Sequence, residues 1–255
     1  MAKVPAVKGS TAVVSWADKL AAKAQEAAAE EKVSSGTAVT CRSGQLSIGG
    51  QAIAGNKLSI VVVGSIFENN YYDPEFDYDP DAPRSPICFA FAKKEEELVP
   101  HEDSSEVQHE SCKGCEWNEF GSAAKGRGKA CKNIRRLALM SASPLTADGI
   151  KDGEIAYMKL PVTSGPGWAA YVNMLSAVHK RPPFAVITEI GAVPDPKTQF
   201  KITFTHKGNI EDDELLGLLD EKNDGTFKFL AVPYQANSAE APAKKKPVAK
   251  GKGKF

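Results

Sequence analysis

The sequence contains no long hydrophobic run and no apolar segment of signal-peptide length near its start. A helix that spans a bilayer needs about 20 consecutive apolar residues, whereas the aliphatic run at 60–63 is of strand length. The N-terminal "MAKVPAVKGS" also lacks the apolar core of a secretory signal. We therefore expect a cytoplasmic protein with no membrane partner.

The chain also lacks net charge, because 32 Lys and Arg residues balance 32 Asp and Glu residues. This average conceals strong segregation along the chain. Residues 68–81 hold six acids and no Lys or Arg, residues 125–136 hold six basic residues and no acid, and residues 244–254 hold six Lys. Since local basic patches govern binding to nucleic acid, zero net charge does not exclude a polyanionic partner.

Three regions differ in composition. Residues 1–35 are expected to form an arm and an Ala-rich helix at 16–32, and residues 234–255 a disordered basic tail. The intervening residues 36–233 alternate short apolar runs with Gly and Pro, which is typical of strands and turns. We expect helices at 164–181 and 210–223, a loop at 68–86, and strands at 37–41, 45–50, 57–67, 87–92, 134–142, 154–162, 184–193, 199–207 and 225–232.

The chain has five cysteines, an odd number that does not suit a disulfide framework, and cytoplasmic cysteines are more often metal ligands or buried thiols. Two of them, Cys112 and Cys115, open the segment "CKGCEWNEFGSAAKGRGKAC". A redox pair should follow a strand and open a helix, whereas Cys112 follows an acidic polar loop. Gly121 and Gly126 have the glycine spacing of a phosphate-binding loop, but the Lys and hydroxyl residue that should follow are missing.

A zinc site fits this segment better. Cys112 and Cys115 can reach one ion from a tight turn, and Cys131 is the obvious third ligand. The fourth ligand is open among Cys88, His109, His101 and Cys41; we favour Cys88, because a ligand on a strand would fasten the loop to the sheet. Buried free thiols are the alternative.

The zinc is expected to be structural and the protein not an enzyme. The chain has neither a His-Glu-x-x-His motif nor the His-x-Glu and Pro-Cys-x-x-Cys pair of zinc deaminases. A site closed by four protein ligands also leaves no position for a reactive water. Together with the strand pattern, this predicts an α+β fold: a β-rich, OB-like antiparallel barrel with inserted helices and a zinc-stabilised loop at 88–131.

The interior of the cysteine segment suggests contact with single-stranded nucleic acid. Lys and Arg neutralise phosphates, and aromatic rings stack on unpaired bases. The basic candidates are Lys125, Arg127, Lys129, Lys132, Arg135 and Arg136, and the aromatic candidates are Trp117, Phe120, Tyr71 and Tyr72. In the alternative interpretation Trp117 and Phe120 fill the core under the loop and the lysines are only solvated.

The segments "ICFAFA" and "ESCKGCEWNEFGSAAKGRGKACKNIRRLAL", with "LPVTS" and "PFAVITEI" further on, resemble a family of tailed-bacteriophage proteins described as single-stranded DNA-binding. The resemblance covers residues 60–205. It implies that Cys88, Cys112, Cys115 and Cys131 bind zinc. It also implies a role in phage DNA replication or recombination in the cytoplasm of the infected bacterium, with replication or recombination proteins as further partners.

Two features depart from that expectation. The tail ends "KKKPVAKGKGKF", whereas many phage proteins of this kind end in an acidic tail, so we expect the tail to add non-specific DNA affinity instead. The acidic aromatic loop at 68–81 supports an alternative function, a protein–protein interaction module that modulates a host or phage enzyme. Self-association into a homo-oligomer is left open by the sequence.

Overall fold

The computed structural model describes residues 23, 37–75, 84–124, 126–196 and 198–234. Contacts divide the chain into residues 1–36 and residues 37–255, and the second unit is described below. The helix expected at 16–32 lies outside the described residues except for Lys23. None of the described helices is long and apolar enough to cross a membrane.

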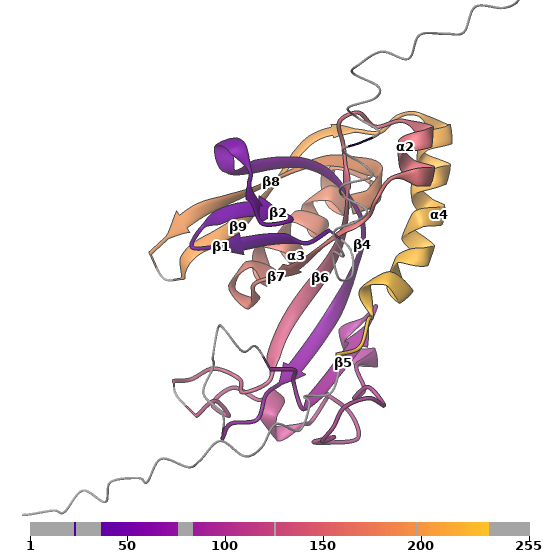
Figure 1. The fold of residues 1–255 in the computed structure, drawn as a ribbon. Coiled ribbons are helices and arrows are strands. Elements are labelled where there is room, and N and C mark those ends of the chain that lie inside the picture. The colour runs from indigo at the N-terminus through magenta and orange to yellow at the C-terminus, as the bar shows by residue number, and fades with distance from the viewer. Residues whose placement is uncertain (1–22, 24–36, 76–83, 125, 197, 235–255) are drawn as a thin grey trace, which may run out of the picture. The chain divides into compact units, whose positions relative to one another are not determined.

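An antiparallel six-stranded sheet forms the centre of this unit (Figure 1). The strand order is β7-β6-β4-β8-β9. Strand β5 pairs with residues 67–71 of β4, on the same edge of β4 where β8 pairs with residues 57–60. Its strands are β4 (Lys57–Tyr71), β5 (Cys88–Ala92), β6 (Lys132–Ser141), β7 (Ala156–Leu160), β8 (Val186–Asp195) and β9 (Gln199–Asn209). The β-branched run at 60–63, which favours an extended backbone, lies in the middle of the sheet.

A second, three-stranded sheet contains β1 (Val39–Arg42), β2 (Gln45–Ile48) and β3 (Gln51–Ala52). The turn between β1 and β2 requires positive φ at Ser43 and Gly44, a conformation that glycine adopts without strain. The outer strands β7 and β9 of the large sheet do not pair with each other. The α+β class with antiparallel sheets is thus confirmed, but the described strands do not form a closed barrel.

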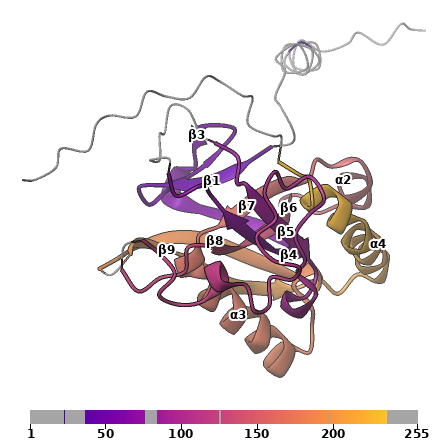
Figure 2. The ribbon, with the colours of Figure 1, turned by 90° about the horizontal axis from the view of Figure 1, so that it is seen from below.

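Two apolar clusters cover opposite faces of the large sheet, with α3 (Gly165–Met174) and α4 (Asp213–Leu230) on different sides (Figure 2). The first cluster includes Trp168 and Tyr171 of α3, and the second includes Leu219 and Leu230 of α4. The remaining helical segments are α2 (Ala147–Asp152), a π-helical turn (Leu175–His179) and 3-10 turns at Ala54–Asn56, Glu95–Glu97, Glu116–Asn118, Val162–Ser164 and Pro183–Ala185.

The last helix corrects one prediction. A helix at 210–223 followed by a strand at 225–232 was expected, whereas α4 is continuous to Leu230. Its buried residues Leu219, Thr226 and Leu230 are separated by seven and four positions, so they share one helical face. The alternation of Phe and Lys after Gly225 suggested a strand, but packing of this face on the sheet determines the structure.

A second correction concerns the acidic loop. Strand β4 continues to Tyr71, so Glu68 lies within the sheet and is fully buried. Its carboxylate accepts hydrogen bonds from Arg136, including one from Nη2 at 2.9 Å, and the Lys159 ammonium lies 3.6 Å away. Burial alone would raise the pKa of Glu68, but the hydrogen bonds and charge of Arg136 hold it below its ordinary value.

The start of the C-terminal tail is also corrected, because Tyr234 is part of the folded unit. Its hydroxyl donates to Glu68 and accepts from Asn70 Nδ2 at 3.0 Å, and its ring lies edge-on to Phe89. Arg136 Nη1 donates to the carbonyl oxygens of Leu230 and Val232 at 2.7 and 3.2 Å. Glu68 and Arg136 therefore fasten the end of α4 to the sheet.

Replacing Arg136 with Met should leave the Glu68 carboxylate buried with too few partners. We expect Arg136→Met to lower the free energy of unfolding by about 3–5 kcal/mol, measured by urea titration. The matched control is Lys94→Met, since Lys94 pairs with Glu97 at 3.4 Å on the surface and such pairs contribute little. Equal stability of the two variants would contradict this interpretation of the buried pair.

Candidate metal centre and basic loop

The pairing of β4 with β5 and with β6 places two cysteines that are distant in sequence on either side of one end of β4. Cys88 begins β5 and is paired with Tyr71 of β4. On the other edge of β4, Asn70 is paired with Lys132, so Cys131 comes just before the first residue of β6 and next to the same end of β4. Cys88 and Cys131 therefore flank the end of β4, although they are 43 positions apart in the sequence.

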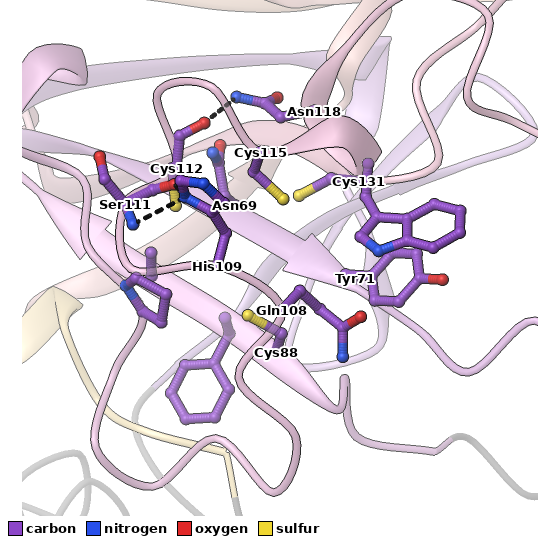
Figure 3. Close-up of a pocket in the computed structure, with 14 residues that line it drawn as sticks. Asn69, Tyr71, Cys88, Gln108, His109, Ser111, Cys112, Cys115, Asn118 and Cys131 are labelled. Carbon is purple, nitrogen blue, oxygen red and sulfur yellow. Dashed lines mark hydrogen bonds between the residues drawn. The ribbon is translucent and has the colours of Figure 1, made fainter.

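The four cysteines of the predicted site line one cavity of about 20 Å³, roughly the space of one small ion or water (Figure 3). Cys112, Cys115 and Cys131 are buried, and Cys88 is partly buried. Figure 3 shows the sulfur atoms of Cys115 and Cys131 directed toward each other. Asn69, Tyr71, His109 and Trp117 also line this cavity.

Backbone hydrogen bonds fix the ends of the cysteine segment. The Cys112 amide donates to the Leu98 carbonyl at 3.1 Å, and the Cys131 amide donates to the Trp117 carbonyl at 2.8 Å. Gly114 has φ +86° between the first two cysteines, where a side chain would be strained. The turn geometry thus favours glycine at the centre of the Cys-x-x-Cys knuckle.

The structure separates the candidates for a fourth ligand. His101 stacks on Phe89 with ring centroids 5.1 Å apart and does not line the cavity. Cys41 lies on β1 and packs against the core cluster that contains α3. Cys88 and His109 both line the cavity, although the Nδ1 atom of His109 lies 2.8 Å from the Ser111 carbonyl oxygen.

No group of three or more Cys, His, Asp or Glu side chains forms a ready metal site in the part of the chain that the structure describes. The donor set nevertheless fits zinc, which binds four soft thiolates tetrahedrally. Burial raises the pKa of Cys112 to about 11 and that of Cys131 to about 12, and repulsion from the neighbouring cysteines adds to both. A bound divalent cation would supply the opposite charge and favour the thiolates.

Two residues missed by sequence reasoning support this centre. The Asn69 side chain hydrogen-bonds the Cys112 thiol and accepts from Asn133 Nδ2 at 2.7 Å. Asn118 Nδ2 donates to the Cys112 carbonyl at 2.9 Å. Sequence reasoning missed Asn69 because it expected a loop from residue 68, whereas β4 extends to Tyr71 and places Asn69 and Tyr71 on one face.

The four aromatic candidates divide into two pairs. Tyr71 and Trp117 stack on each other with ring centroids 5.0 Å apart, so they form the floor under the loop as in the alternative interpretation. Phe120 is 82% exposed, and Tyr72 is 41% exposed. Phe120 therefore does not fill the core, contrary to that interpretation.

Phe120 projects from a compact turn. The amides of Gly121 and Ala123 donate to the Gly128 carbonyl at 3.0 and 3.2 Å. The Lys129 ammonium lies 5.2 Å from the centroid of the Phe120 ring. An exposed ring and a cation are thus held together on one turn.

The six basic candidates have different environments. Arg127 and Lys132 are exposed, Lys129 is partly buried and donates to Asn118, and Lys125 lies outside the described residues. Arg136 is buried against Glu68, so its place among the predicted phosphate contacts is corrected. Arg135 is partly buried, with its guanidinium carbon 3.1 Å from the centroid of Phe67.

Part of the acidic aromatic loop expected at 68–81 cannot be compared with the structure, because residues 76–83 lie outside the described residues.

No family model matches the chain, and neither a curated protein nor a solved structure shows significant similarity to it.

The zinc hypothesis predicts about one zinc per chain by elemental analysis of the purified protein. Cys131→Ser should lose the metal and lower the melting temperature, because the ligand count falls below four. Cys41→Ser is the matched control and should keep the metal. Comparison of Cys88→Ser with His109→Ala identifies the fourth ligand, and full zinc in Cys131→Ser would contradict the hypothesis.

Proposed function

We propose that this protein binds single-stranded DNA without sequence preference, and that Cys88, Cys112, Cys115 and Cys131 hold a structural zinc ion. The observation that carries the proposal is the 82% exposure of Phe120 on a glycine-rich basic turn. An exposed aromatic ring gains most from a flat apolar partner, and every DNA base offers one.

The charge around Phe120 suits a polyanion. Residues 112–132 carry five basic and two acidic side chains. Arg127 and Lys132 are exposed, and no acidic side chain among the described residues lies within ion-pair distance of them. Lysine and arginine near phosphates release counterions, which makes such binding tight at low salt and independent of sequence.

The role of the zinc in this proposal is to order the loop. Residues 112–131 have few apolar contacts of their own, and metal binding supplies ordering free energy in such segments. Four cysteine ligands leave no coordination position for substrate or water, so the proposed centre supports binding and not catalysis.

Phage DNA replication or recombination, in the cytoplasm of an infected bacterium, is the process in which we propose that the protein acts. This part rests on the family resemblance of the cysteine segment. Proteins of the replication or recombination machinery would then be its further partners. The open antiparallel sheet takes the place of the expected OB-like barrel as the support for the loop.

Binding of fluorescently labelled oligo-dT, followed by anisotropy, tests the proposal. Phe120→Ala should weaken binding by about 5- to 100-fold, since base stacking is lost. Val178→Ala is the control, because Val178 is similarly exposed at 67% but lies away from the loop. Failure of the unaltered protein to bind at low salt would overturn the proposal, and unchanged binding by Phe120→Ala would overturn the assignment of the loop as the binding surface.

The salt dependence gives a second, independent prediction. For single strands the logarithm of affinity falls with the logarithm of salt concentration by about 0.7 per phosphate contact. Arg127→Ala and Lys132→Ala should each reduce this slope by about 0.7. Lys57→Ala, at the opposite end of β4, should leave it unchanged.

A further inference from the structure

Arg135 and Arg136 are neighbours in β6 but point to opposite faces of the sheet. Arg136 is buried and its guanidinium is satisfied by Glu68 and two carbonyl oxygens. Arg135 lies opposite Phe67 of β4, and its guanidinium carbon lies over that ring, 3.1 Å from the ring centroid.

Among the residues that the structure describes, none forms a hydrogen bond or ion pair with the guanidinium of Arg135. Glu95 attracts it from beyond ion-pair distance, and burial lowers the pKa of Arg135 to about 10. A partly desolvated charge without hydrogen bonds is unfavourable for stability, so this arrangement suits an anion that arrives from outside.

We propose that Arg135 on Phe67 is a platform that takes one nucleotide of the single strand, by stacking on its base and hydrogen-bonding its phosphate. This inference rests on the proposed function. A guanidinium plane can stack on an unpaired base while its edge donates to phosphate oxygens. Phe67 packs on the cluster of Ala90, Ala92 and Leu98, which fixes the plane in advance.

The platform and the cysteine cavity share one face of β4. Phe67, Asn69 and Tyr71 lie on the same face of β4, and successive members of this row are about 7 Å apart. Asn69 and Tyr71 line the cysteine cavity.

A purely structural role for Arg135 makes the opposite prediction about stability. If the side chain only packed on Phe67, its replacement would lower the melting temperature and leave DNA affinity unchanged. If it is a platform, Arg135→Met should weaken oligo-dT binding about tenfold while the melting temperature stays equal or rises.

Two further variants sharpen the comparison. Arg135→Lys keeps the charge but loses the planar group, so it should recover only part of the affinity. Glu95→Gln removes the anion that competes for Arg135 and should tighten binding. Lys57→Met, a surface cation at the far end of β4, serves as the matched control and should behave as the unaltered protein.

Photo-crosslinking separates this inference from the proposed function. Oligo-dT that carries 5-iododeoxyuridine should crosslink to the peptide that contains Phe67 and to the peptide that contains Phe120. Crosslinks to Phe120 alone, with full affinity in Arg135→Met, would overturn the platform and leave the proposed function standing. Weakened binding in Arg135→Met but not in Phe120→Ala would instead overturn the loop assignment, and absence of any binding would overturn both.

Discussion

The pairing of β4 with two different partners at its C-terminal end is the constraint on which the rest of the structure depends. There β5 pairs with one edge of the strand and β6 with the other. This arrangement brings Cys88 and Cys131 to the same place, and the loop that carries Cys112 and Cys115 closes over them. A small shift of either register would separate the thiols, so the pairing of the sheet determines whether the four cysteines can share one cavity.

The two faces of this strand carry different chemistry because side chains alternate along it. One face holds Glu68 and Asn70, which bind Arg136 and Tyr234 and fasten the C-terminal end of α4. The other face holds Phe67, Asn69 and Tyr71, which lead from Arg135 to the cysteine cavity. The buried charge of Glu68 is thus neutralised on the first face, whereas Arg135 on the second face has no ion-pair partner among the described residues.

Much of this arrangement could be predicted from the sequence, and the failures have physical causes. The β-branched run at 60–63 and the cysteine spacing identified β4 and three of the ligand candidates, because both signals are local. The burial of Glu68 and its ion pair with Arg136 could not be predicted from a local signal. The segment that follows it is polar and becomes acidic from Asp73 onward, whereas its partner Arg136 lies 68 positions away. Strand alternation could separate Arg135 from Arg136, but only tertiary packing determines which of them is buried.

Phe120 and Arg135 are both unfavourable for the folded chain by itself. The Phe120 ring is 82% exposed, and the Arg135 guanidinium is partly buried without a hydrogen bond to any residue that the structure describes. The buried Glu68–Arg136 pair joins β4 to β6 next to Arg135, on the opposite face of the sheet, and so fixes the backbone beneath Arg135. In the binding that we propose, the ligand would not need to order this part of the chain, which favours affinity.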